Sequence, residues 1–279
     1  MSTQAKAPAA KPAAQPQKKS GGIGSGIIIL VLAVVAHLIF YLWFGNGSHF
    51  EGGVNTGHPI SGDYYGLVFK GGFIVPILMT CFLTALVFSI ERILTISKAN
   101  GTGEINAFVR KVQSLLDADK IEDAMKECDK QKGSVGNVTL SALKKYKQLT
   151  TDTALDKEQK LAALSKEVEE STSLEMPMLE KNLTIIATLA SVSTLLGLLG
   201  TVFGMIRSFA AMGASGGSTD STALANGISE ALINTALGIG TSAICIVAYN
   251  YFTSRIDTLT YSIDEIGLSV NQNFAAHHS

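Results

Sequence analysis

Four apolar segments of membrane length set the strongest limit on how this chain folds. They cover residues 23–44, 72–96, 183–206 and 228–252. A helix needs about 20 mostly apolar residues to cross a bilayer. Because hydrocarbon offers the backbone no hydrogen-bond partners, such a segment crosses as a helix. The sequence therefore predicts an all-α integral membrane protein.

The composition supports this class and argues against several others. Hydrophobic residues make up 47% of the chain and charged residues only 16%, a balance typical of membrane proteins. The net charge of −1 argues against nucleic acid as a main partner. The three cysteines, Cys81, Cys128 and Cys245, are few and widely spaced, so we expect neither a disulfide framework nor a metal site.

Basic residues beside the apolar segments set the orientation, because Lys and Arg concentrate on the cytoplasmic side. Residues 45–70 are poor in Lys and Arg and residues 211–225 have none, so both should lie on the outer side. The basic residues on the opposite side are Lys6, Lys11, Lys18, Lys19, Arg92, Lys98, Arg110, Lys111 and Arg255. We expect both termini in the cytoplasm. The first apolar segment is too long for a signal peptide and is interpreted as a retained anchor.

These assignments divide the chain into nine parts. In order, we expect a disordered cytoplasmic tail (1–22), an extra transmembrane helix (23–44), a periplasmic loop (45–70), a first core transmembrane helix (71–97), a cytoplasmic helical domain (98–182), a second core transmembrane helix (183–210), a periplasmic link (211–225), a third core transmembrane helix (226–254) and a cytoplasmic C-terminal helix and tail (255–279). The long membrane helices should extend into the cytoplasmic domain.

Helical periodicity organises the cytoplasmic parts. A first helix is expected over residues 104–131, a break at 133–136 and a second helix from about Val138. Asp152 is a candidate cap for a third helix, and Pro177 marks a kink or boundary. After the fourth apolar segment, Ile256 begins an a/d pattern that includes Leu259, Ile263, Ile266 and Val270. Two interpretations stay open: packing on the other cytoplasmic helices, or a seam for self-association.

The last two apolar segments carry small and polar residues in register. Gly197, Gly200 and Gly204 share one face, which predicts close helix packing in lipid. Two hydroxyl stripes repeat every seven residues: Thr194, Thr201 and Ser208 in one segment, and Thr235, Ser242 and Tyr249 in the other. A single such hydroxyl often bonds only its own i−4 carbonyl. Two aligned stripes with an acid nearby favour a polar cavity.

Counting residues places these groups at matching depths. Thr201 lies about 18 residues from the start of its segment and Thr235 about 19 from the end of its own, so antiparallel helices hold them at similar height. Arg207 and Glu230 also fall at one depth, nearer the outer surface. They either form an ion pair or leave Glu230 free to titrate while Arg207 snorkels to the headgroups. A carboxylate within a span marks a pathway for ions or protons by default.

The motifs GLLGTVFGMI, ALANGISEALINTALGI and YNYF, with ERILTI closing the second apolar segment, resemble the MotA/TolQ/ExbB proton-channel family, ExbB and TolQ most closely. The resemblance implies a homopentameric ring in a bacterial inner membrane, with two ExbD-like single-span subunits in its pore and a TonB-like protein carrying the work outward. It implies an ExbB-like motor subunit for TonB-type energised transport, with no cofactor and no enzymatic activity. Thr201, Thr235 and Glu230 fall on the family's polar pore residues, and Thr194 and Ser242 extend that lining.

The chain also departs from the family pattern. Ser193 and Thr194 replace an Ala-Pro pair, and Ile244 replaces a proline of the last span, which puts helix bending there in doubt. The first segment is additional, and its His37 is expected to be packed or hydrogen-bonded rather than a proton relay. Other classes stay open: a TolQ-type envelope motor, a flagellar or gliding stator, a secondary transporter, an intramembrane enzyme or a passive scaffold. No internal repeat and no nucleophile–base pair supports the transporter or the enzyme.

Overall fold

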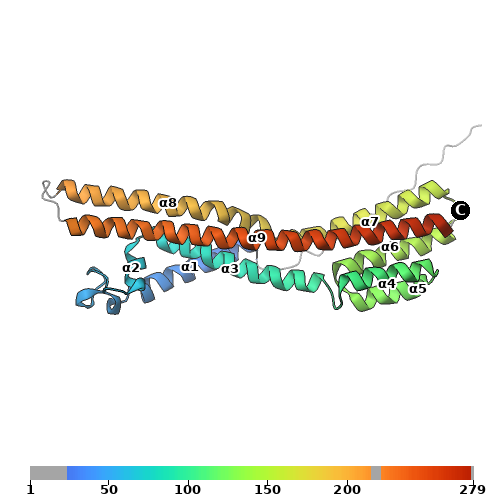
Figure 1. Ribbon diagram of the computed structural model, residues 1–279, viewed down its shortest axis with the longest axis horizontal. Helices are drawn as coiled ribbons and strands as arrows, with labels where there is room; N and C mark the ends of the chain where they lie inside the picture. The colour runs from blue at the N-terminus through green and yellow to red at the C-terminus, as the bar shows by residue number, and fades with distance from the viewer. Residues whose placement is uncertain (1–23, 215–220, 278–279) are drawn as a thin grey trace, which may run out of the picture.

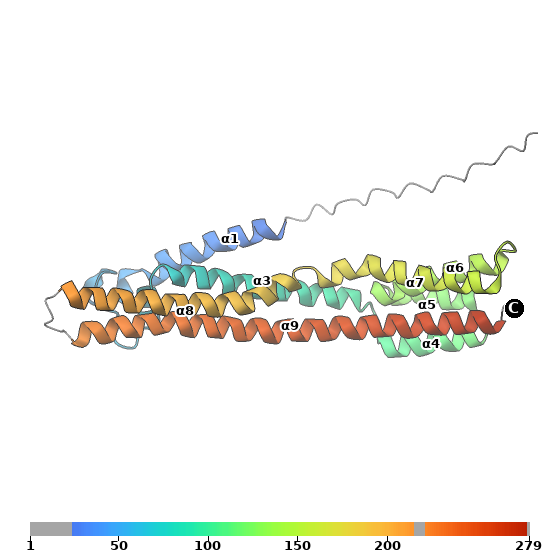
Figure 2. The ribbon, with the colours of Figure 1, turned by 90° about the horizontal axis from the view of Figure 1, so that it is seen from above.

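The computed structural model describes residues 24–214 and 221–277, so the predicted N-terminal tail and the middle of the predicted periplasmic link lie outside the described residues. The molecule is elongated, and α9 (Ser221–His277) runs along its whole length (Figure 1). A second long helix, α8 (Leu183–Ala214), lies beside one half of α9 in both views (Figure 2). The predicted all-α fold is confirmed for the described residues.

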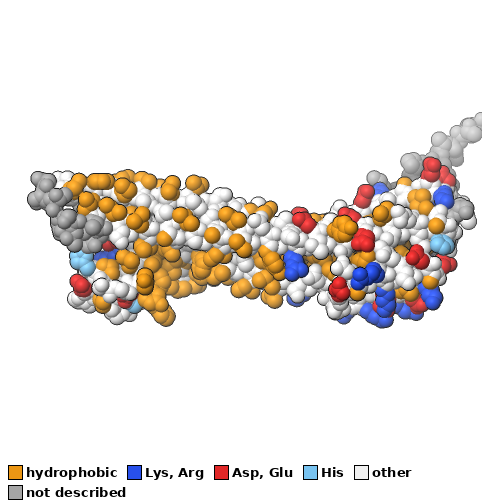
Figure 3. All heavy atoms as spheres, in the orientation of Figure 1, with side chains coloured by type: hydrophobic (Ala, Val, Ile, Leu, Met, Phe, Trp, Pro, Cys, Tyr) orange, Lys and Arg blue, Asp and Glu red, His pale blue; other side chains and the backbone are white. Residues whose placement is uncertain are grey.

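Among the described residues, four helices are long and apolar enough to cross a membrane. They are α1 (Ser25–Leu38), which continues as the π-helical turn η1 (Ile39–Phe44), then α3 (Ile74–Ala99), α8 and α9. Hydrophobic side chains cover the surface of the half of the molecule where these helices lie together, whereas charged side chains gather over the opposite end (Figure 3). His37 in α1 is exposed and its Nδ1 lies 2.8 Å from the Ala33 carbonyl oxygen, which confirms the hydrogen-bonded interpretation.

The segment between the first two membrane helices is folded. It contains the short 3₁₀ turns η2 (Gly47–His49) and η3 (Glu51–Gly53) and the helix α2 (Tyr64–Lys70). Asp63 caps α2 by accepting hydrogen bonds from the amides of Tyr65 and Gly66 at 2.9 and 3.2 Å. The ring of Phe69 stacks on Phe40 at 4.8 Å and meets Phe50 edge-on at 5.6 Å. These contacts fasten the segment to the end of the first span.

The helices of the predicted cytoplasmic domain are α4 (Ile105–Asp117), α5 (Ile121–Gln131), α6 (Gly133–Thr151) and α7 (Lys157–Glu180). The prediction of one helix over residues 104–131 was wrong, because the chain turns at Asp119, whose φ is +54°. The amide of Lys120 donates to the Leu115 carbonyl at 2.8 Å and that of Asp119 to Leu116 at 2.9 Å. This is the hydrogen-bond pattern of a Schellman motif, which ends a helix at a left-handed residue.

Three predicted boundaries also needed correction. The break before α6 lies at Lys132 and Gly133, which both have positive φ, so Gly136 and Val138 are inside the helix. Asp156 rather than Asp152 caps α7, because it forms a capping box with Gln159. Pro177 lies inside α7, and the chain breaks one turn later, where Asn182 has a φ of +62°.

The C-terminal part of α9 packs inside the bundle of α4–α7 of its own chain. Every residue of the a/d pattern is at least 96% buried there: Ile256, Leu259, Ile263, Ile266 and Val270. Asn273 fixes the register, since it accepts from the Tyr146 hydroxyl at 2.9 Å and donates to the Leu116 carbonyl at 2.9 Å. Of the two interpretations of this pattern, packing on the cytoplasmic helices is confirmed. The pattern is fully used within one chain.

A buried arginine joins α3 to the end of α7. Arg92 on α3 is 1% exposed and donates from Nη1 to the carbonyls of Met178 and Leu179 at 2.9 and 3.0 Å. Its Nε and Nη2 donate to both carboxylate oxygens of Glu91, at 2.8 and 2.6 Å. Asn182 also donates to Glu91, at 3.1 Å. The guanidinium therefore satisfies carbonyls that the end of α7 leaves without helical partners.

Candidate functional site

The three predicted packing glycines bring α8 against α9 at close range. A Cβ built on Gly197 would lie 2.8 Å from the Asn234 carbonyl oxygen, and one on Gly200 only 2.5 Å from the Asn234 Cβ. One on Gly204 would overlap the Cβ of Ala231. Gly238 on α9 makes the reciprocal approach, because its Cβ would lie 2.8 Å from the Gly197 Cα. Small residues on both helices thus allow backbone contact.

This approach joins the hydroxyls of Thr201 and Thr235. The two side chains are hydrogen-bonded to each other across the helix interface. The Oγ1 of each threonine also lies within hydrogen-bond distance of the Gly197 carbonyl oxygen, 3.3 Å for Thr201 and 3.2 Å for Thr235, so the hydroxyl that accepts within the pair can donate to this carbonyl. The bond from Thr201 is the common i−4 bond within a helix, whereas Thr235 reaches the carbonyl from the other helix. The matching heights predicted for these two hydroxyls are confirmed.

The remaining hydroxyls of the two stripes have separate partners. Ser242 is buried and donates across the interface to the Ala190 carbonyl at 2.5 Å, so it fastens α9 to α8. Ser208 donates to the carbonyl of Gly204 at 3.0 Å, four residues earlier in its own helix. Thr194 is half-buried on α8, one turn from Gly197 and two turns from Thr201. Along the helix axis, the threonine pair therefore lies between Ser208 on one side and Thr194 and Ser242 on the other.

Glu230 lies one to two turns from the threonine pair, half-buried near the N-terminal end of α9. It lines two cavities, of about 420 and 240 Å³. The smaller cavity also receives Arg207, Lys70 and His58. Arg207 and Glu230 are not among the ion pairs formed by the described residues. Of the two arrangements left open by the sequence, the carboxylate without a contact pair is the one observed.

Asn234 is a site residue that sequence reasoning underrated. It is 1% exposed, lines the smaller cavity and lies directly between Glu230 and Thr235 along α9. Its Nδ2 donates to the Gly71 carbonyl at 2.9 Å, while its Oδ1 accepts no hydrogen bond from the described residues. An amide inside an apolar helix was the available signal, but its long-range partner Gly71 was not visible in the sequence.

The site is thus a column of polar groups along the α8–α9 interface. It descends from Glu230 through Asn234 to the threonine pair and ends at Ser242, about 18 Å below by helical rise. Hydroxyls, an amide and a carboxylate can hold water and pass hydrogen bonds along such a column. Among the described residues no group of three or more His, Cys, Asp or Glu side chains is placed to hold a metal ion.

Long membrane helices, close glycine packing and a polar column define a class of multi-pass, proton-handling membrane proteins. Residues 131–265 match the family model described as the MotA/TolQ/ExbB proton channel family. The Tol-Pal system protein TolQ of Pseudomonas aeruginosa is 30% identical over 156 residues, which cover 56% of this chain and 67% of that protein. The chain belongs to the MotA/TolQ/ExbB family and is a proton-channel motor subunit of it.

Two further relatives carry the name ExbB. The biopolymer transport protein ExbB of Neisseria meningitidis is 26% identical over 205 residues, covering 71% of this chain and 91% of that protein. The biopolymer transport protein ExbB of Helicobacter pylori is 42% identical over 82 residues, covering 29% of this chain and 56% of that protein. Identities at this level, to proteins of both names, establish the family.

Proposed function

We propose that this chain is an ExbB-like subunit that forms a ring in a bacterial inner membrane and couples proton entry to mechanical work. The observation that carries the proposal is the hydroxyl pair of Thr201 and Thr235, held beneath the half-buried Glu230. Hydroxyls that bond each other can each exchange that bond for one to a carboxylate of a partner subunit. This chain supplies the column, and a partner supplies the acid that shuttles.

The partners follow from the same reasoning. The three core spans contain no membrane aspartate, so the shuttle acid would come from an ExbD-like single-span subunit, in two copies inside a homopentamer. A TonB-like protein would carry the work across the periplasm. Long exposed hydrophobic side chains on α8 and α9, such as Leu195, Val202 and Val247, leave area for neighbouring subunits and lipid. The basic residues beside the spans favour a cytoplasmic position for both termini.

The assembly is tested by native mass spectrometry of the protein purified in detergent, alone and co-expressed with its single-span partner. Five copies, with two partner copies when the partner is present, support the ring. A monomer or dimer that ignores the partner contradicts it.

The proton role is tested by isosteric substitution. Thr235→Val and Glu230→Gln should abolish energised uptake through an outer-membrane receptor while the ring still assembles. Thr235→Ser keeps a hydroxyl and should retain most of the activity, so it separates the hydroxyl from the packing. Full activity of Thr235→Val or Glu230→Gln would overturn the role assigned to that residue.

A TolQ-type role in envelope maintenance is the second candidate. It is supported by the match to a protein named TolQ, which covers 67% of that protein's length. Complementation separates the two roles. The gene should restore uptake to cells that lack ExbB if the first proposal holds, and envelope integrity to cells that lack TolQ if the second does.

A further inference from the structure

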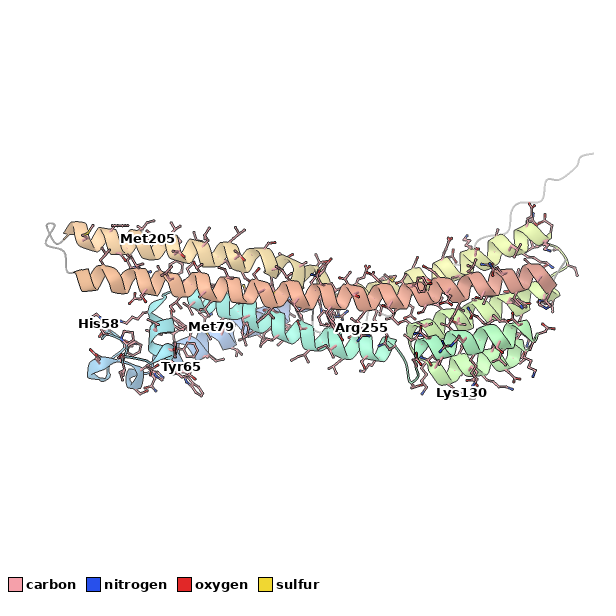
Figure 4. The ribbon with its side chains drawn as sticks, viewed as in Figure 1. His58, Tyr65, Met79, Lys130, Met205 and Arg255 are labelled. Atoms are coloured by element: carbon pink, nitrogen blue, oxygen red, sulfur yellow. The ribbon has the colours of Figure 1, made fainter. Side chains whose placement is uncertain are left out.

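The exposed apolar surface of the membrane helices ends where α3 meets the bundle of α4–α7. On α3 the last exposed large apolar side chain is that of Leu94, and Lys98 follows one turn later. Lys181 lies directly before α8, and it lines the same cavity as Lys98. Figure 4 places Arg255 of α9 at the level of the last turns of α3. Basic residues from three segments thus share one level, as they do where the hydrocarbon of a bilayer meets its headgroups.

A cavity of about 420 Å³, which we call the junction cavity, lies at this level between the end of α3, the start of α6 and the end of α7. Its volume falls in the range of ligand pockets, about 300–1,000 Å³. Its charged lining consists of three cations, Arg92, Lys98 and Lys181, and two carboxylates, Glu91 and Glu175. Three positive and two negative charges leave the wall with a net charge of +1.

Both carboxylates and the arginine already have partners within the chain. Glu175 accepts from the Ser134 hydroxyl at 2.8 Å with one oxygen and from the Asn137 amide at 3.1 Å with the other. Glu91 accepts from Nε and Nη2 of Arg92, whose Nη1 donates to the two carbonyls at the end of α7. These groups therefore build the wall of the junction cavity and offer little to a ligand.

The groups of the wall that remain open are all hydrogen-bond donors. Lys98 and Lys181 form no ion pair with the described residues. Thr95 lines the cavity one turn before Lys98, on the same face of α3, and its hydroxyl makes no hydrogen bond with the described residues. Two ammonium groups and a hydroxyl suit the oxygens of a phosphate group.

We propose that the junction cavity binds the headgroup of an anionic phospholipid such as phosphatidylglycerol, with the phosphodiester between Lys98 and Lys181. One negative charge balances the net charge of the wall, and basic pockets beside membrane helices bind such headgroups. The acyl chains would lie along Ile90, Ile93 and Leu94 of α3, which are 58, 52 and 58% exposed. A zwitterionic headgroup adds an ammonium group for which the wall has no open acceptor. The proposal does not depend on the proton role proposed above.

Lipid selectivity is measured by native mass spectrometry of the full-length protein, stripped of lipid in detergent. The protein is titrated with phosphatidylglycerol and, separately, with phosphatidylcholine of the same acyl chains, which carries the same phosphodiester but no net charge. Phosphatidylglycerol should bind at least about fivefold more tightly, the factor that one charge contact at about 4 Å contributes even in water. Equal affinities for the two lipids overturn the proposal.

Variants assign the preference to the two lysines. Lys98→Gln and Lys181→Gln should each lower the affinity for phosphatidylglycerol about fivefold and leave that for phosphatidylcholine unchanged. Lys98→Arg keeps the charge and should keep most of the affinity. The matched control is Lys144→Gln, which removes an exposed lysine about 15 Å further along α6 from Ser134 and should change neither affinity. Full affinity for phosphatidylglycerol in the double variant of Lys98→Gln and Lys181→Gln overturns the site.

Thiol protection locates the lipid. Met178 lines the junction cavity and is 46% exposed, so Met178→Cys reports on its occupancy, while Ser173→Cys on the exposed surface of α7 is the control. The three native cysteines are buried, which keeps the background low. Phosphatidylglycerol should slow the reaction of N-ethylmaleimide at residue 178 and leave that at residue 173 unchanged. No protection at residue 178 overturns the location, and equal protection by chainless glycerophosphoglycerol at the same concentration overturns the choice of a lipid over a soluble phosphate.

Discussion

Replacing Arg92, whose buried guanidinium joins α3 to the end of α7, should destabilise the protein more than a single substitution on the surface does. The substitution Arg92→Met keeps much of the side chain's length and removes its charge and donors. It leaves two carbonyls at the end of α7, those of Met178 and Leu179, without the bonds of 2.9 and 3.0 Å that they now accept. It also leaves Glu91 without its main cationic partner.

The size of the effect follows from burial. Removing one partner of a buried ion pair costs about 3–5 kcal/mol, because the other charge stays uncompensated. The Glu91 side chain is 37% exposed, so water recovers part of that cost, and Asn182 still donates to it. We therefore expect Arg92→Met to lower the free energy of unfolding by about 3 kcal/mol.

Thermal unfolding of the detergent-purified protein, followed by circular dichroism, measures this effect. The midpoint should fall by at least about 5 °C. The matched control is Lys98→Met, which removes an exposed cation from the same helix and the same cavity wall and should change the midpoint little. The double variant Glu91→Gln with Arg92→Met should be more stable than Arg92→Met alone. An Arg92→Met protein as stable as the Lys98→Met control would refute the reasoning.

Three further predictions concern packing, a thiol and the outer segment. Gly200→Ala should destabilise the α8–α9 interface by about 1–3 kcal/mol, because the added Cβ would lie 2.5 Å from the Cβ of Asn234. Gly240→Ala is the control, since the space at that position is open and the substitution should not destabilise the protein. The thermal unfolding midpoints of the two variants test this difference. Burial raises the pKa of the Cys128 thiol to about 12, so N-ethylmaleimide at pH 8 should modify residue 128 only after denaturation, as counted by mass spectrometry. The hydrogen bond from His49 holds the pKa of Asp63 below its ordinary value of 3.8. Stability from this depressed pKa is present above 3.8 and is lost as pH falls below it, so hydrogen exchange in α2 should accelerate there, and Asp63→Asn should remove that step.

The sequence predicted the structure best where the regular geometry of a helix relates residue number to position. Helical rise alone matched Thr201 to Thr235, because the distance along a helix depends only on residue count. Glycine spacing identified the face of α8 that meets α9 for the same reason. It could not identify Gly238 or Asn234 as the opposing surface, since which residues meet depends on how two helices cross.

Turns and long-range contacts were the parts that the sequence left open. Asp119 ends α4 in a left-handed conformation that aspartate adopts only when the surrounding turn supports it. The cavities beside Glu230 depend on residues 51, 58, 63 and 70 meeting a helix that lies more than 150 residues later in the chain. No local pattern encodes such a contact, so these cavities could not be predicted from the sequence.

The unbroken course of α9 bears on how the proposed motor would move. The helix contains 57 residues and spans about 85 Å. It carries Glu230 and Thr235 near one end and the buried apolar residues from Ile256 to Val270 near the other. The helix continues without a break through Ile244. Arg92 fastens α3 to the end of α7. A subunit built around one continuous helix favours a rigid ring in the proposed assembly, so the large motion that performs work would belong to the subunits inside it.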